Sequence, residues 1–142
     1  MPDGYEVDEV WKARGRGFQM ATIQSEGKVI HFTGQVAWTK DERVAGVGDV
    51  ELQTRACFEN IRLILQAVGG ELSDIVAITT YYTDQEQLPK IQKVRSEVFE
   101  PGVEPVSTSI MVAGLGNKDF LVELTPVAVI PWDRFKEPNS AA

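Results

Sequence analysis

The sequence predicts an α+β domain in which two helices cover one face of a mixed six-stranded β-sheet. Three observations support this class. Two segments carry apolar residues at helical spacing, six runs are rich in β-branched and aromatic residues, and the order along the chain is β-β-β-α-β-α-β-β. At 142 residues the chain fits one domain over residues 1–142, with a core over about 18–130 and a loose tail over 132–142.

The N-terminal region contains the first three predicted strands. Residues 5–13 alternate loosely between polar and apolar side chains and are expected to form an edge strand. Residues 18–25 and 28–38 flank a Glu-Gly dipeptide at 26–27. Two β-rich runs around a two-residue loop that ends in glycine are typical of a β-hairpin.

Both faces of this predicted sheet carry apolar side chains. Ile30 and Phe32 fall on one face of their strand, while Val29 and His31 fall on the other, because side chains alternate along a strand. A single layer of two helices covers only one of these faces. We therefore expect another copy of the chain to cover the face that the helices leave open.

The clearest predicted element is a helix that follows Asp49, a suitable N-cap, and ends before Gly69. Glu51 and Arg55 lie four residues apart, and such acid-to-base pairs stabilise the exposed face of a helix. The other face would pack on the sheet through Leu52, Ala56, Cys57, Ile61, Ile64, Leu65 and Val68, with Asn60 as its one polar member.

The second half of the chain reads as strand, helix, strand and strand. Residues 74–83 are rich in β-branched and aromatic side chains, as expected of a buried strand. A second helix begins near Pro89, because proline is accepted only in the first helical turn. Residues 105–124 contain a strand, a turn and the start of a last strand over 119–131. Pro126 is expected at a sheet edge or a bulge, because it lacks an N–H for the ladder.

The composition argues against several classes of protein. A net charge of −7 disfavours nucleic acid as a main partner, because phosphate backbones attract basic surfaces. No apolar run is long enough to span a membrane and no signal peptide is visible, so we expect a cytoplasmic protein. A single cysteine suits a reducing compartment. The spacing of histidine, cysteine and carboxylates fits no metal site, and no glycine-rich phosphate loop occurs, so we expect neither a metal nor a cofactor.

Three stretches together carry a family pattern. The strand end FTGQVAW, at residues 32–38, matches a Ser-Gly-Gln strand end with Thr33 in place of serine. Residues 51–84 match a helix, its glycine-rich end and the strand that follows. PVSTSIMVAGLGNKDFLVEL, at 105–124, matches a C-terminal signature of two strands and a short loop. Over roughly residues 18–130 the chain resembles the RidA/YjgF family of reactive-intermediate (enamine/imine) deaminases.

The resemblance implies a chorismate-mutase-like subunit, assembled as a homotrimer with a cleft between each pair of neighbouring subunits. It also implies hydrolysis of a reactive enamine or imine metabolite without a cofactor. Such a cleft has only to orient a polarised C=N bond and a water molecule. The residues that the resemblance places in the cleft are Phe18, Met20, Thr33, Gly34, Gln92, Ser107, Ser109, Glu123 and Thr125.

One position departs from the family pattern. The signature arginine, which holds a substrate carboxylate in the family, is Ser107 here. Serine offers one donor and no charge, so it does not replace a bidentate ion pair. We therefore expect a substrate other than the usual 2-imino acid, unless Arg14 or Arg16 reaches the cleft as another anion anchor.

Three functions remain open at this point. The first is an enamine or imine deaminase, with its catalytic activity in the absence of the arginine left open. The second is a non-catalytic trimer that binds a small molecule, which a neutral, hydroxyl-lined cleft also fits. The third, a ribonuclease or translation inhibitor, has the least support, because the chain is acidic and contains a single histidine, His31.

Overall fold

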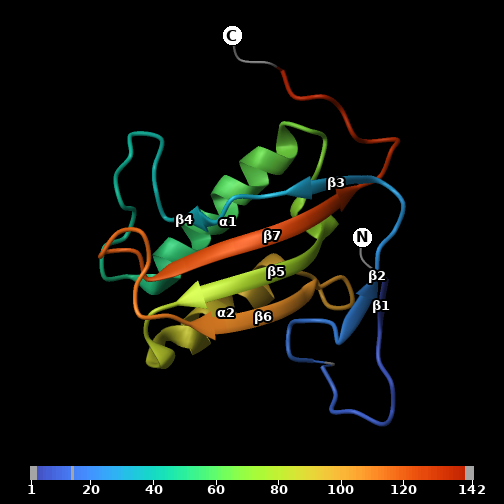
Figure 1. Ribbon diagram of the computed structural model, residues 1–142, viewed down its shortest axis with the longest axis horizontal. Helices are drawn as coiled ribbons and strands as arrows, with labels where there is room; N and C mark the ends of the chain where they lie inside the picture. The colour runs from blue at the N-terminus through green and yellow to red at the C-terminus, as the bar shows by residue number, and fades with distance from the viewer. Residues whose placement is uncertain (1–2, 14, 140–142) are drawn as a thin grey trace.

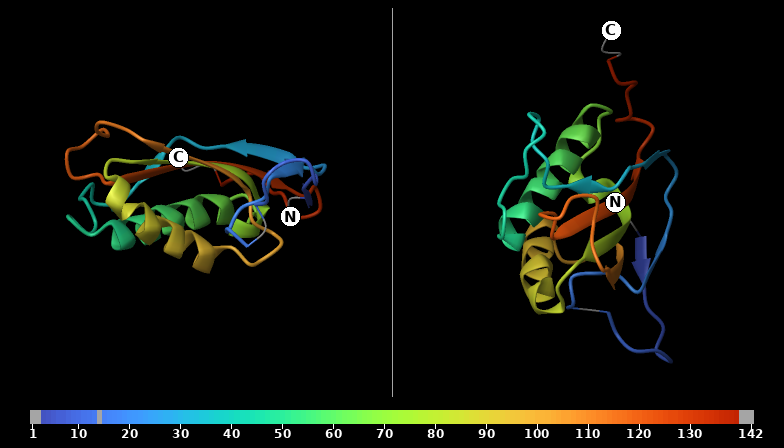
Figure 2. Two further views of the ribbon diagram at one scale, coloured as in Figure 1. Left: turned by 90° about the horizontal axis from the view of Figure 1, so that it is seen from below. Right: turned by 60° about the vertical axis from the view of Figure 1, so that its left-hand side comes forward.

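Two helices lie side by side on one face of a β-sheet, as the views of the computed structural model show (Figures 1 and 2). The structure describes residues 3–13 and 15–139. The elements in chain order are β1 (Asp3–Tyr5), β2 (Ala21–Ile23), β3 (Lys28–His31), β4 (Gln35–Val36), α1 (Val50–Gln66), the 3-10 helix η1 (Leu72–Asp74), β5 (Ile75–Tyr82), the 3-10 helix η2 (Gln85–Gln87), α2 (Leu88–Val98), β6 (Val106–Met111) and β7 (Val122–Ile130).

The main sheet has the order β3-β7-β5-β6, with β4 pairing β7 beyond the end of β3. β5 and β6 run parallel and the other pairs are antiparallel, so the sheet is mixed. The predicted α+β class, with both helices on one face, is confirmed. The predicted count of six strands is wrong, because the main sheet contains five and the first two strands form a separate sheet.

The predicted hairpin between residues 18–25 and 28–38 does not form. The nine-residue strand β7 pairs with β3 and β4 in succession, so residues 28–38 divide into two short strands along it. The shorter strand β2 pairs instead with β1, with Gly4 opposite Thr22. The edge strand expected at 5–13 is also misplaced, because the strand covers only Asp3–Tyr5.

Pro126 lies on an inner strand rather than at an edge. It pairs with Ile78 of β5 on one side of β7. On the other side it lies opposite the break between β3 and β4, where residues 32–34 face only Thr125 and Pro126. This excess of one residue is the arrangement of a β-bulge, which accommodates a residue without an N–H.

Helix α1 begins as predicted, with the Asp49 carboxylate accepting a hydrogen bond from the Leu52 amide at 3.0 Å. Its buried face is rotated from the predicted stripe, however, and Leu52 and Ile64 are exposed. Gln53 takes a core position because its side chain is fully satisfied by backbone. It donates to the carbonyl oxygens of Gly46 and Asp119 and accepts from the Leu121 amide. The buried residues of α1 are Val50, Gln53, Thr54, Cys57, Phe58, Ile61 and Leu65.

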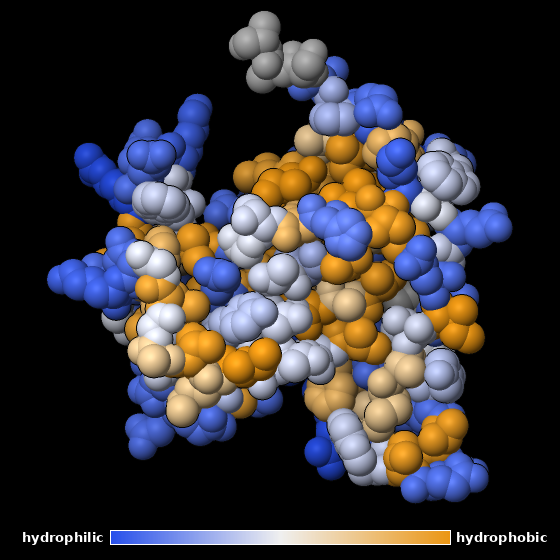
Figure 3. Space-filling model, in the orientation of Figure 1, coloured by the Kyte–Doolittle hydropathy of each residue, from blue (hydrophilic) through white to orange (hydrophobic). Residues whose placement is uncertain are grey.

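The face of the sheet opposite the helices carries no helical layer, and Figure 3 shows hydrophobic residues gathered on it over β3 and β7. Ile30 packs against the core beneath the sheet, whereas Val29 on the opposite face is 36% exposed, as predicted. At the other edge, Ile110 and Met111 of β6 are 40% and 56% exposed. Within the described residues, no helix is long and apolar enough to cross a membrane.

The segment after β7 is held more firmly than the expected loose tail. The Arg134 guanidinium donates to both carboxylate oxygens of Asp74, at 2.6 and 3.0 Å, and to the Gly69 carbonyl oxygen at 3.1 Å. Asp74 is fully buried, and its hydrogen bond raises the pKa of Arg134. Phe135 packs against the core and the Lys136 amide bonds the Val68 carbonyl oxygen. The expectation of a loose tail is therefore wrong for residues 134–136.

We predict that Arg134→Met lowers the free energy of unfolding by about 2 kcal/mol, because it removes charge-assisted hydrogen bonds from a buried carboxylate. Urea titration followed by circular dichroism measures this change. The matched control is Arg62→Met, which breaks an exposed pair with Glu59 and should leave stability nearly unchanged. Equal stability of the two variants would contradict the role given to Arg134.

Candidate functional site

The two serines of β6 lie on the helix-facing side of the sheet. In the parallel register Ser107 pairs with Ile78, and Ser109 pairs with Thr80. Paired residues of neighbouring strands share a face, and Ile78 belongs to the core beneath the helices. β6 is an edge strand, and along it Ser107 is half-buried and Ser109 is exposed. Both hydroxyls thus lie at the accessible border of the core.

Arg95 of α2 meets Ser107 from the helical side. Its Nη1 donates a hydrogen bond to the Ser107 Oγ at 2.8 Å, and its Cζ lies 6.0 Å from the centre of the Phe18 ring. The side chain is buried, with 3% exposed, and burial lowers the pKa of its guanidinium. No carboxylate of the described residues pairs with it. The structure therefore places a buried cation beside the position where the family's arginine is missing.

Sequence reasoning missed Arg95, although the pattern of α2 contained a signal. Ile91 and Val94 form the buried face of this helix, and Arg95 lies four residues after Ile91. A residue at that spacing shares the same face. An arginine on an otherwise apolar helix face is unusual, because charged side chains are seldom fully buried unless paired. Such a residue has either a counter-charge or a function.

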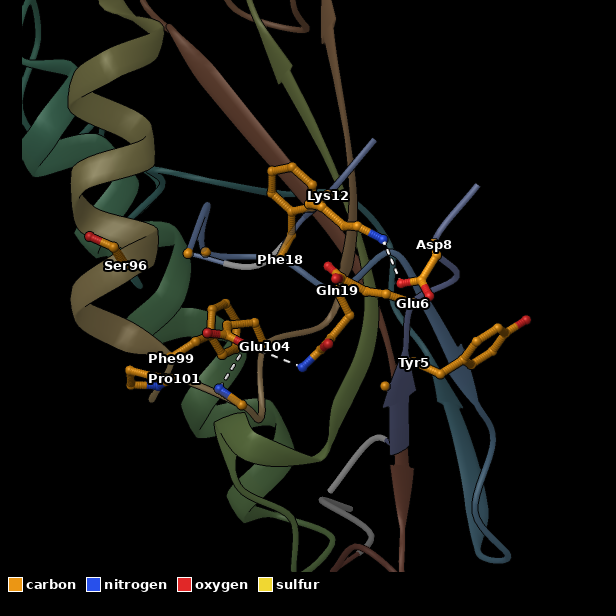
Figure 4. Close-up of a pocket in the computed structure, with 14 residues that line it drawn as sticks. Tyr5, Glu6, Asp8, Lys12, Phe18, Gln19, Ser96, Phe99, Pro101 and Glu104 are labelled. Carbon is orange, nitrogen blue, oxygen red and sulfur yellow. Dashed lines mark hydrogen bonds and ion pairs between the residues drawn. The ribbon is translucent and has the colours of Figure 1, made fainter. Parts of the chain in front are cut away.

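The N-terminal segment brings Phe18 to this place. The Gln19 amide donates to the Pro105 carbonyl oxygen at 3.1 Å, and Gln19 bridges Val106 at the start of β6. Phe18 and Gln19 also line a cavity of about 940 Å³ between this segment and the end of α2, where Gln19 bonds Glu104 (Figure 4). The predicted cleft residue Phe18 is thus beside Arg95, whereas Met20 is half-buried and lines neither this cavity nor the one beside Gly34.

A second group of predicted residues gathers at the opposite edge of the sheet. Thr33, Gly34 and Glu123 line a cavity of about 440 Å³, together with the edge-to-face rings of Trp38 and Phe120. A Cβ on Gly34 would overlap the Glu123 carboxylate, so only glycine allows this carboxylate to lie against the backbone. No described residue is hydrogen-bonded to the Glu123 carboxylate, which is half-buried and open to a ligand or water.

These two groups lie too far apart to act as one site within a single chain. The first group lies on β6. In the second group Thr33 and Gly34 directly precede β4, and Glu123 lies on the neighbouring strand β7, opposite Val36. β6 is three strand spacings, about 14 Å, from β4 and two strand spacings, about 10 Å, from β7. The groups also differ in chemistry, since one offers hydroxyls and a cation and the other a carboxylate. We call them the β6 half-site (Arg95, Ser107, Ser109 and Phe18) and the β4 half-site (Thr33, Gly34 and Glu123).

The remaining predicted residues lie outside both half-sites. Gln92 is exposed on α2, and Thr125 lies on the open face of the sheet opposite Thr79. The guanidinium of Arg16 lies over the Trp11 ring, 5.8 Å from its centre. Arg14, the other predicted anion anchor, lies outside the described residues. Arg95 rather than Arg16 is the cation that the structure shows at Ser107.

The described residues offer little for metal or thiol chemistry. Across 3–13 and 15–139, no three histidine, cysteine, aspartate or glutamate side chains gather where they could hold a metal ion. Cys57 is buried in α1, and burial, with a smaller contribution from the Glu123 charge, raises the pKa of its thiol to about 12. A thiol with this pKa is almost entirely protonated at neutral pH and is a poor nucleophile.

Comparison with known proteins gives a consistent group of relatives. A protein-family model described as Endoribonuclease L-PSP matches residues 16–130. A RutC family protein of Pyrococcus abyssi is 32% identical over 102 residues, which cover 72% of this chain and 79% of that protein. The family-model match over residues 16–130 includes every residue of both half-sites.

Solved structures agree in fold. YyfB of Yersinia pestis, a Rid family protein of unknown function, has a TM-score of 0.80 at 24% identity, covering 91% of this chain and 98% of that one. TdcF of E. coli, solved with bound serine, has a TM-score of 0.65 at 26% identity, covering 75% of this chain and 84% of that one. The predicted family resemblance is thus confirmed by sequence and by fold.

We predict that Cys57 reacts with a thiol reagent only after unfolding, because the native thiol is buried and its pKa is about 12. Release of the coloured thiolate from Ellman's reagent at neutral pH measures the reaction, with and without guanidinium chloride. The chain contains no second cysteine, so the signal reports this site alone. Fast labelling of the native protein would contradict the burial of Cys57.

Proposed function

Because the chain belongs to the YjgF/RidA family, whose model matches residues 16–130, we propose that it is a cofactor-independent hydrolase of small reactive enamines or imines. In this reaction water adds to the imine carbon, the C–N bond then breaks, and the products are a carbonyl compound and ammonia. An enamine first takes up a proton on carbon to give the imine. The reaction needs orientation and polarisation more than a strong nucleophile.

The observation that carries this proposal is the division of the site into two complementary halves. The β6 half-site provides hydrogen-bond donors at Ser107 and Ser109, and the β4 half-site provides the Glu123 carboxylate beside Gly34. When the β6 edge of one subunit adjoins the β4 edge of another, donors and carboxylate face each other across one cleft. The donors would hold the substrate, and the carboxylate would accept a proton from the attacking water.

This arrangement requires a homo-oligomer, and we propose the homotrimer that the family resemblance implies. Two features of the subunit support self-association. The sheet has an open face, on which Val29 is exposed at one edge, and β6 leaves Ile110 exposed at the other. Neither edge of the main sheet is paired with a further strand in the described residues, apart from the single bridge between Gln19 and Val106, and unpaired edges invite association. The buried free thiol of Cys57 supports our placement of the protein in the reducing cytoplasm.

A second candidate is a trimer that binds a small metabolite without turnover. TdcF, a structural neighbour, was solved with bound serine, which supports a site of the size of an amino acid. A ribonuclease, as the name of the matched family model suggests, has weaker physical support. The net charge of −7 opposes RNA binding, and His31 is exposed on β3, far from the Arg95 edge of the sheet. Salt-sensitive RNA binding would be evidence for the ribonuclease.

We predict that the protein accelerates the decay of an imine generated in situ, and that Glu123→Gln slows this reaction at least about 10²-fold. The amide keeps the size of the carboxylate but does not accept a proton. Decay is followed by absorbance with 2-iminobutyrate and with an imine that lacks a carboxylate. The control is Glu59→Gln, an exposed glutamate of α1 that pairs with Arg62. Binding of metabolites without any acceleration would favour the second candidate.

We predict that two inactive variants restore activity when their subunits are mixed. Ser107→Ala damages the β6 half-site and Glu123→Gln the β4 half-site. If each cleft takes one half-site from each of two subunits, random trimers contain intact clefts at about a quarter of the positions. The mixture is unfolded and refolded together, its mass is measured by light scattering, and its rate is compared with that of each variant refolded alone. No recovery in a mixed trimer would place both half-sites of a cleft on one chain.

A further inference from the structure

Arg95 is a buried cation without a counter-charge among the described residues. Only 3% of the residue is exposed, and within the described residues its hydrogen bond runs from Nη1 to the neutral Ser107 Oγ at 2.8 Å. Its other close neighbour is the face of the Phe18 ring, 6.0 Å from the Cζ. Arginine stays charged in proteins and carries five N–H donors. Burying such a group without an anion is costly, so an anion is expected to complete the site.

The direction of the Arg95–Ser107 hydrogen bond fixes what Ser107 can offer. A guanidinium only donates, so the serine oxygen is the acceptor and its own O–H proton points elsewhere. No described residue accepts that proton. A hydroxyl that accepts a hydrogen bond from a cation becomes a stronger donor itself. Ser107 therefore presents a polarised O–H at the half-exposed border of the core, with the positive charge directly behind it.

A second hydroxyl nearby also lacks a partner. Thr80 is 1% exposed, and its Oγ1 has no hydrogen-bond partner among the described residues. Thr80 pairs with Ser109 and lies on the same face of the sheet as Ser107. A buried hydroxyl without a partner costs stability unless a ligand or water satisfies it. Independently of Arg95, it indicates a polar ligand or water beside β5, one strand in from the β6 edge.

We propose that Arg95 and Ser107 form a two-residue anion site, in which the Ser107 hydroxyl donates to a small carboxylate while the Arg95 guanidinium supplies the charge. Arg95 is a positioning residue, since it acts through Ser107. The ligand is a small monocarboxylate. The site contains a single cation and the whole chain has a net charge of −7, and both features disfavour a polyanion. The proposal rests on the proposed function for its choice of cleft, and it replaces the expectation that the substrate lacks a carboxylate.

The test measures the binding of 2-oxobutyrate and of its neutral amide to the full chain by titration calorimetry. Binding of an unreactive carbonyl compound does not depend on turnover. The wild type is expected to bind the carboxylate and not the amide. Arg95→Gln is expected to weaken carboxylate binding about tenfold, the difference between a charge-assisted and a neutral hydrogen bond. Arg95→Lys, which keeps the charge, is expected to restore part of the affinity and the preference over the amide.

Two further variants keep the test decisive. Ser107→Ala should lose carboxylate binding even if Arg95→Gln does not fold, as checked by circular dichroism. Arg62→Gln removes an exposed arginine that pairs with Glu59 on α1 and should bind like the wild type. Unchanged affinity in Ser107→Ala, or equal binding of carboxylate and amide by the wild type, overturns the anion site.

Binding and hydrolysis measurements together distinguish the anion site from the hydrolase activity. Carboxylate binding that depends on Arg95, without hydrolysis of any imine, supports the anion site and overturns the hydrolase. Hydrolysis of 2-iminobutyrate that is unchanged in Arg95→Gln supports the hydrolase and overturns the anion site. If a crystal of the oligomer shows a carboxylate of a second copy on Ser107, the site is an inter-subunit ion pair and the proposal is also overturned.

Discussion

The hydrogen bond from Arg95 to Ser107 joins helix α2 to the edge strand β6 at the candidate site. Helix α2 packs on the sheet through Ile91 and Val94, and the same face carries the guanidinium to the edge strand β6. Beyond the bridge between Gln19 and Val106 at its start, β6 has a strand neighbour on one side only. A charge buried against a neutral hydroxyl is stabilised poorly by the subunit alone. The packing of α2 on the sheet therefore positions Arg95 where an anion bound at Ser107 would stabilise its charge.

The sheet then determines how such a site can become complete. Its order puts Ser107 at the β6 edge, Gly34 beside β4 at the other edge, and Glu123 on β7 next to β4, with β5 between β7 and β6. A subunit thus carries two halves with opposite charge that it does not join itself. In the proposed oligomer, association of edges from different subunits would bring cation and carboxylate into one cleft, with room for a polarised C=N bond and a water molecule between them. In this proposal the site is complete only when the subunits associate.

Much of the fold could be predicted from the sequence because helix caps, proline positions and strand alternation depend on residues that are close together in the chain. Asp49 caps α1, Pro89 lies in the first turn of α2, and alternation along β3 separates Ile30 from Val29. The predicted hairpin between residues 18–25 and 28–38 is wrong because β3 pairs with β7, which lies about a hundred residues away in the sequence. A short loop with glycine allows a hairpin but does not exclude a better partner elsewhere in the chain.

The candidate site was predicted only in part, because it too depends on contacts between residues that are far apart in the sequence. The motif positions identified Ser107 and Gly34, and the structure gives each a specific neighbour. Arg95 was missed because its role depends on a contact between α2 and β6 that no local pattern encodes. The most direct measurement is a crystal structure of the oligomer with 2-oxobutyrate. We expect the ligand carboxylate on the Ser107 hydroxyl, with Arg95 behind it and Glu123 of a neighbouring subunit across the cleft. A carboxylate bound away from Ser107 would contradict this arrangement.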